Sequence, residues 1–102
     1  MRKGTIVGFS GSWGSGLGSL QIKDARTGKV EGVPCDNAPT VRALRAAFGD
    51  EVVSSGHTVN QAPFINKEIY WMMDDMGLTL GGFTPAEDAS PEIEEAYEKE
   101  VA

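Results

Sequence analysis

The sequence predicts a mainly β domain: a small five-stranded barrel with one helix between the third and fourth strands, followed by a short C-terminal helix. Strand-like and helix-like runs occur in the order strand, strand, strand, helix, strand, strand. The segment joining the first two strands contains Gly8, Gly11, Gly14, Gly16 and Gly18, and repeated glycine is typical of strands that bend sharply in a small barrel. With 102 residues, of which 40% are hydrophobic, the chain can form one modest core.

The first half of the chain predicts three consecutive strands. Gly4–Phe9 is rich in β-favouring residues, and Leu17–Lys23 alternates in part between apolar and polar side chains. Asp24–Gly28 is typical of a tight turn that ends in glycine. Lys29–Pro34 is then expected to form the third strand, and its proline is expected to end it.

A helix is expected to follow, because Asp36 is a candidate N-cap and Pro39 falls in the first turn. The apolar residues Val41, Leu44 and Phe48 share one helical face, and Gly49 is placed to end the helix. The segment 50–63 gives no clear pattern.

Lys67–Met73 and Leu78–Phe83 predict the last two strands, joined by a hairpin at Asp74–Gly77. We therefore assign residues 1–83 to the barrel and residues 84–102 to an acidic linker and helix. That helix is expected to start at Ser90-Pro91, and its narrow apolar stripe consists of Ile93, Tyr97 and Val101.

The charge is distributed unevenly. The net charge is −6, and residues 84–102, with seven acids and one base, account for all of it. Residues 1–48 carry +4 and residues 49–83 carry −4, so a basic surface on the first half is compatible with an acidic chain.

Cys35 is the single cysteine and cannot form an internal disulfide, which favours a reducing, cytoplasmic compartment. No apolar run approaches the roughly 18 residues of a membrane span, and the start of the chain leads into a strand rather than an apolar signal segment. We expect no membrane association.

The segment Gly4-Thr5-Ile6-Val7-Gly8-Phe9-Ser10, followed by Gly16-Leu17-Gly18-Ser19-Leu20, resembles the start of a cold-shock domain. That family opens with Gly-x-Val-Lys-Trp-Phe-Asn, followed by Lys-Gly-Phe-Gly-Phe-Ile. Beyond residues 4–20 the resemblance extends only to the order of elements. It implies the five-stranded OB barrel and binding of single-stranded nucleic acid.

The sequence departs from this family at the positions that stack on bases. The tryptophan and phenylalanines of the family's platform correspond here to Gly8, Leu17 and Ser19, and its lysine corresponds to Val7. The family's third-strand motif has no counterpart around Lys29–Asp36. Since stacking contributes about 1–3 kcal/mol per base, the resemblance supports the fold more than the family's binding chemistry.

Our first functional hypothesis is weak binding of single-stranded RNA or DNA. Trp13 lies on the loop between the first two strands, which OB folds use for ligands, although it is equally compatible with a lid folded over one barrel end. A phosphate-binding patch near Trp13 is predicted from Lys3, Lys23, Arg26 and Lys29. Ordinary solvated charge is the competing interpretation.

The alternative hypothesis is a protein-interaction module that uses Trp13, Tyr70, Met72, Ile93 and Tyr97. Tyr70 and Met72 share one strand face, which is either an exposed patch or covered by core or tail. The acidic tail is a solvated helix, a flap that docks Ile93 and Tyr97 on the barrel, or an intramolecular competitor for the basic patch. Docking is favoured, because a short isolated helix is marginal in water.

Residue types for catalysis are sparse. Cys35, Asp36 and His57 have no recurring ligand or nucleophile spacing, and the Gly14–Gly18 repeat lacks the Lys-Ser/Thr ending and the helix of a phosphate-binding loop. We therefore expect a non-catalytic binding module with no catalytic residues, no metal site and no cofactor.

Overall fold

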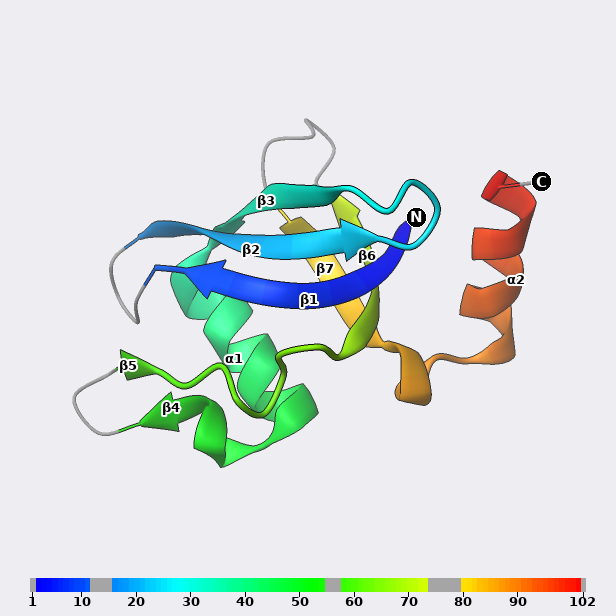
Figure 1. Ribbon diagram of the computed structural model, residues 1–102. Coiled ribbons are helices and arrows are strands. Elements are labelled where there is room, and N and C mark those ends of the chain that lie inside the picture. Colours follow the sequence, from blue (N-terminus) through cyan, green and yellow to red (C-terminus); the bar gives the residue numbers. More distant parts are fainter. Residues whose placement is uncertain (1, 12–15, 55–57, 74–79, 102) are drawn as a thin grey trace.

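The computed structural model describes residues 2–11, 16–54, 58–73 and 80–101. The strands are β1 (Arg2–Ser10), β2 (Leu17–Asp24), β3 (Val30–Asp36), β4 (Val53–Ser54), β5 (Thr58–Val59), β6 (Glu68–Met73) and β7 (Leu80–Pro85). The helices are α1 (Asn37–Phe48) and α2 (Pro91–Val101), with the short 3-10 helices η1 (Asp50–Val52) and η3 (Ala86–Asp88). A mainly β fold with two helices, as predicted, is confirmed (Figure 1).

Five strands form one antiparallel sheet in the order β3-β2-β1-β6-β7, and β4 and β5 form a separate two-stranded sheet. Some Cα atoms of the two edge strands, β3 and β7, lie within 8 Å of each other. Paired strands lie closer, at about 5 Å, and no ladder joins β3 to β7 within the described ranges. The sheet is therefore curved but not closed into a barrel by hydrogen bonds there.

The core lies between the inner face of the sheet and α1, which packs across that face (Figure 1). Its fully buried side chains include Ile6, Leu20, Ile22, Cys35, Val41, Leu44, Val52, Phe64, Ile69 and Trp71. Phe64, which precedes β6, contacts the rings of Phe9 and Phe48 at centroid distances of 6.5 and 6.3 Å. Because α1 covers the inner face, the outer face of β1, β2 and β3 is left to solvent.

The third strand is longer than its sequence predicts. β3 continues through Pro34 to Asp36, and Pro34 pairs with Ser19 of β2. The expectation that proline ends this strand is wrong because β3 is an edge strand, where a missing N–H does not interrupt a ladder.

The helix boundaries follow the sequence closely. Asp36 is the N-cap of α1, although its side chain makes no capping hydrogen bond, and Gly49 ends the helix at a φ of 103°.

β7 runs to Pro85, two residues beyond the predicted end, and α2 begins at Pro91. The segment 50–63, which the sequence leaves unassigned, contains η1, β4 and β5. The predicted turn at residues 74–77 lies outside the described residues.

β1 changes partner halfway along its length. It pairs with β6 only over Arg2–Thr5 and carries a bulge between Ile6 and Gly8. Beyond the bulge, the Phe9 N–H donates to Gln61 Oε1 at 3.1 Å, and Gln61 Nε2 donates to the Phe9 carbonyl at 3.2 Å. The Gln61 side chain thus takes the place of a neighbouring strand for the backbone groups of Phe9.

Candidate functional site

The turn between β2 and β3 is held by the buried carboxylate of Asp24. Asp24 Oδ1 accepts the backbone N–H groups of Arg26 at 2.8 Å and Thr27 at 3.0 Å. The Gly28 N–H donates to the Asp24 carbonyl at 2.8 Å, and Gly28 adopts a φ of 74° that favours glycine. This local network fixes a turn from which the side chains of Arg26 and Lys29 extend into solvent.

Three of the four predicted phosphate-binding cations have no acidic partner. Lys23, Arg26 and Lys29 are exposed and make no ion pair within the described part of the chain. The nearby acids are already engaged, because Asp24 points inward to hold the turn and Glu31 accepts from Arg2 at 2.8 Å. We call Lys23, Arg26 and Lys29 the cation cluster.

Lys3, the fourth predicted cation, is engaged elsewhere. It lies opposite Tyr70 in the β1–β6 ladder, with its Nζ 3.6 Å from Glu68 Oε1 and 5.3 Å from the centre of the Tyr70 ring. Partial burial lowers the pKa of Lys3, but Glu68 and Tyr70 outweigh it and bring the pKa above its ordinary value. The Lys3 carbonyl accepts the Ala25 N–H at 2.9 Å, so this residue adjoins the cation cluster.

The predicted aromatic patch on β6 is divided by α2. Tyr70 is only 5% exposed, and the Tyr97 ring of α2 packs edge-on against it at 5.7 Å. Met72, on the same face, is 51% exposed, and Ile93 is half-buried. Of the alternatives that the sequence leaves open, Tyr70 is covered by the C-terminal segment rather than exposed. Tyr97 contacts the sheet, as expected if this segment docks on it.

Trp13 lies outside the described residues, but the two ends of its loop are placed. The β1–β2 ladder runs from the Gly4–Asp24 pair to the Ser10–Ser19 pair, about 20 Å away given the rise of a strand. The loop departs from the Ser10–Ser19 end, whereas the cation cluster belongs to the Gly4–Asp24 end. The base of this loop is therefore at the other end of the ladder from the predicted cations, and the prediction that they lie near Trp13 itself falls outside the described residues.

The base of the glycine loop packs on Asn37, the first residue of α1, which is fully buried. Its N–H donates to the Gly16 carbonyl at 2.7 Å, and its Nδ2 donates to the Leu17 carbonyl at 3.5 Å. A Cβ at Gly11 would lie 2.7 Å from Asn37 Oδ1, and one at Gly18 would overlap the same atom. Gly11 and Gly16 also have φ values of 136° and 89°, so glycine is required here both for close approach and for a backbone conformation that other residues rarely adopt.

The outer face of β1, β2 and β3 carries small side chains at its centre. Gly8 and Ser19, at two positions of the family's stacking platform, are half-buried, and Leu17 at the third is 67% exposed. Gln21 donates to the hydroxyl groups of Ser10 at 3.3 Å and Ser19 at 3.2 Å. In the described part of these three strands this face has no aromatic ring, and its nearest ring in the sheet is Tyr70 of β6.

The residues considered for catalysis do not form a reactive group in the described structure. Cys35 is fully buried, and burial raises the pKa of its thiol, which keeps it protonated. Asp36 is exposed, and His57 lies outside the described residues. Among the residues that were placed, no cluster of three or more metal-ligating side chains occurs.

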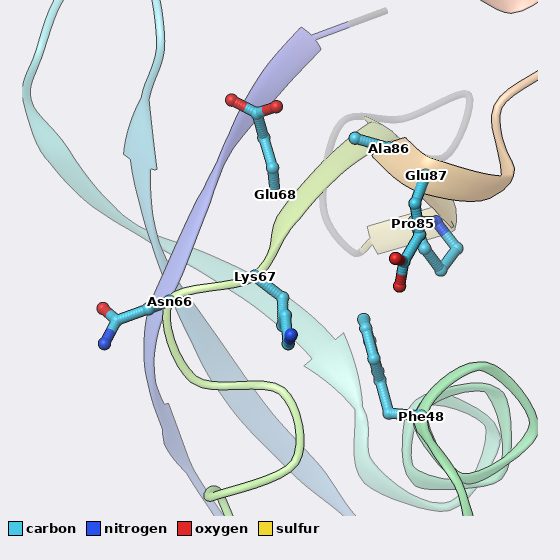
Figure 2. A pocket seen from close by; sticks show the side chains of 7 residues that line it. All are labelled: Phe48, Asn66, Lys67, Glu68, Pro85, Ala86 and Glu87. Atoms are coloured by element: carbon cyan, nitrogen blue, oxygen red, sulfur yellow. The ribbon is translucent and has the colours of Figure 1, made fainter.

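A pocket of about 250 Å³, which the sequence does not predict, lies where α1 ends beside the start of β6 and the end of β7. Figure 2 shows the side chains of Phe48, Lys67 and Glu87 directed toward this space, while Asn66 and Glu68 point away from it. The apolar wall and the two opposite charges give it a mixed character. None of the residues that line this pocket belongs to the cation cluster.

Within the described ranges, no helix is both long enough and apolar enough to span a membrane. Comparison of the chain with models of protein families, with curated proteins and with solved structures found no match.

Proposed function

We propose that this protein is a small non-catalytic binding module that binds single-stranded nucleic acid weakly, through the cation cluster and the outer face of β1, β2 and β3. The observation that carries the proposal is the cation cluster itself: three exposed bases, Lys23 near the end of β2 and Arg26 and Lys29 on the fixed turn that follows, with the neighbouring acids engaged elsewhere. Phosphate contacts of this kind supply affinity that does not depend on base sequence.

We also propose that the curved sheet is an OB-like barrel. Its support is the order β3-β2-β1-β6-β7, the approach of the edge strands β3 and β7, and the place of α1 between β3 and β6. OB folds bind single strands across the face of their second and third strands. Here that face corresponds to the outer surface that α1 leaves uncovered.

The glycines of the outer face suit a backbone-dominated contact. A glycine in a strand allows another backbone to approach closely, and Gly8 and Gly32 lie on this face on either side of Gln21. The absence of rings from this outer face, in the described part of β1–β3, removes most of the stacking energy. Weak, salt-sensitive binding with little base preference follows.

The test is a titration of fluorescein-labelled oligo(dT) by anisotropy at several salt concentrations, with the full chain. The variant Lys23→Ala/Arg26→Ala/Lys29→Ala removes the cation cluster. Its matched control, Arg42→Ala/Arg45→Ala/Lys67→Ala, removes three exposed bases of α1 and the segment before β6 and has the same net charge.

Three phosphate contacts on a single strand give a slope of log K against log salt of about −2. We expect the cluster variant to lose this slope and most of its affinity, and the control to retain them. Equal losses in the two variants, or no binding by the unmodified protein at low salt, would overturn the proposal.

Binding of a protein is the second candidate, because large apolar side chains are exposed on the described strands. Leu17 and Val30 are 67% and 57% exposed at the two ends of the β2–β3 ladder, and Met72 of β6 is 51% exposed. Co-purification after nuclease treatment, compared between the unmodified protein and a Leu17→Ser/Met72→Ser variant, tests it. Partners that disappear with nuclease alone would exclude this candidate.

A further inference from the structure

We propose that α2 covers part of the binding face in cis and competes with single-stranded nucleic acid for it, because the Tyr97 ring, in a T-shaped contact with Tyr70, occupies space that a base on Tyr70 would need. The inference rests on the proposed function, because it names a further contact residue of that site, Tyr70, and a device that regulates access to it.

The contact that carries the inference is aromatic. Tyr70 points to the outer face of β6, opposite Lys3 of β1, and the Tyr97 ring packs on it at 5.7 Å with an interplanar angle of 72°. With Tyr97 removed, Tyr70 would present a ring to solvent with the Lys3 ammonium 5.3 Å from its centre. A ring flanked by a cation is the arrangement on which unpaired bases stack.

This covered ring adjoins the cation cluster. The Lys3 carbonyl accepts the Ala25 N–H at 2.9 Å, and Ala25 belongs to the turn that carries Arg26 and Lys29. In Figure 1, α2 stands at the end of the sheet where β1 begins and where the β2–β3 turn lies. A strand that contacts the cluster would therefore reach Tyr70 next, if α2 left it free.

The negative charge of α2 also supports competition with nucleic acid. Its residues Glu92, Glu94, Glu95 and Glu98 are exposed. The single ion pair that the described structure places on this helix, between Glu95 and Lys99 at 3.3 Å, lies within the helix itself. The helix thus brings a row of carboxylates, the charge type of a phosphate backbone, to the cationic end of the sheet.

The cover is held weakly enough to be displaced. In the described residues no ion pair joins α2 to the sheet. The Tyr70–Tyr97 ring contact, together with the half-buried Ile93 and Ala96, therefore attaches the helix without charge. An aromatic pair of this kind shifts an equilibrium by about two- to tenfold. Helix docking and nucleic-acid binding compete for the same surface. The docked helix can therefore lower the affinity for nucleic acid by no more than a factor set by the equilibrium constant of docking.

The experiment compares full-length Tyr97→Ala with Tyr97→Phe, which keeps the ring, in the same oligo(dT) titration. We expect Tyr97→Ala to bind about two- to tenfold more tightly than the unmodified protein, and Tyr97→Phe to bind as the unmodified protein does. Adding Tyr70→Leu to Tyr97→Ala should abolish the gain. Protection of the Cys35 thiol from alkylation verifies that each variant is folded.

A second readout needs no nucleic acid. Acetylation of Tyr70 by N-acetylimidazole, located by mass spectrometry, should be slow in the unmodified protein and fast in Tyr97→Ala, and oligo(dT) should slow it again in that variant. If Tyr97→Ala leaves affinity unchanged while the cation-cluster variant loses binding, the cover is refuted and the binding function stands. If no variant binds oligo(dT), both proposals fail.

Discussion

The two ends of the β1–β2 ladder differ in what surrounds them, although both are closely packed at a glycine: a Cβ at Gly4 would lie 2.5 Å from the Lys23 carbonyl oxygen. At the Ser10–Ser19 end, glycines pack directly on the buried Asn37, so that backbone and side-chain atoms are in close contact. At the Gly4–Asp24 end, a fixed turn presents exposed cations, and α2 is attached through a ring contact and half-buried apolar side chains. The comparison indicates that the glycine-rich end serves stability and that the charged end serves binding.

Gly18→Ala is expected to have the largest effect on stability, because the new Cβ would overlap Asn37 Oδ1 and lie 2.5 Å from the Ser10 carbonyl. We expect a loss of about 3 kcal/mol in the free energy of unfolding, measured by urea denaturation. Gly8→Ala is the matched control, because its Cβ meets only the flexible end of Gln21 and should change stability by less than about 1 kcal/mol. Equal effects of the two variants would contradict the assignment of the glycine end.

Asn37→Ala should cost about 2 kcal/mol, since it leaves the Leu17 carbonyl without the Asn37 donor. The double variant Gly18→Ala/Asn37→Ala sharpens the test, because removal of the amide relieves part of the overlap. We expect it to be more stable than the sum of the single losses by about 0.5 kcal/mol or more. Strict additivity of the two changes would show that Gly18 and Asn37 do not interact.

Cys35 reports on the same end, since it pairs with Gly18 across the β2–β3 ladder. Burial raises the pKa of its thiol in the folded state, so its contribution to stability is complete below the unfolded pKa of about 8.5 and is lost as pH rises above it. We therefore expect the free energy of unfolding to fall as pH rises from 8 to 9.5. Cys35→Ala should remove this pH dependence from urea denaturation curves, and an unchanged dependence would place its origin elsewhere.

At the charged end, Tyr97→Ala should lower the free energy of unfolding by less than about 1.5 kcal/mol, because it removes one aromatic pair. Tyr97→Phe should be neutral, since the ring remains. Thermal unfolding followed by circular dichroism measures both. A loss as large as that of Gly18→Ala would mean that α2 is part of the core rather than a cover.

The smallest effect on stability is expected for the cation-cluster variant, Lys23→Ala/Arg26→Ala/Lys29→Ala. These side chains are exposed and have no ion-pair partner in the described structure, so each should change stability by no more than about 0.5 kcal/mol. Urea denaturation provides the measurement. A marked destabilisation would show that these residues have a structural role instead of a binding one.

Much of the fold is predictable because it depends on local pattern. Alternating apolar residues locate the strands of the main sheet, and the Asp36 and Gly49 boundaries locate α1. The end of β3 is predicted wrongly at Pro34. A strand tolerates proline at the edge of a sheet, and the position of β3 at the edge depends on the arrangement of the whole sheet. The short strands β4 and β5 are missed because two residues carry no periodic signal.

The candidate site is less predictable, because it depends on contacts between distant residues. The sequence identifies four cations, but only pairing across the sheet separates Lys3, which contacts Glu68, from the three that stay free of ion pairs within the described ranges. The sequence analysis does not identify Asn37 as a contact of the glycine loop. The glycines at positions 11 and 18 are the available signal, because they leave room for a neighbouring side chain. Tyr70 is likewise covered by a helix 27 residues away along the chain, at Tyr97.

Chemical-shift mapping in the ¹⁵N–¹H spectrum of the full chain, during titration with oligo(dT), tests most directly which end of the ladder binds. Our account predicts the largest changes at residues 23–29 and at Lys3, with further changes along α2 around Tyr97 as the strand displaces it. Gly18 and Asn37 should change little. The largest changes at Gly11, Gly16 and Leu17, or no changes at all, would contradict the assignment of binding to the charged end.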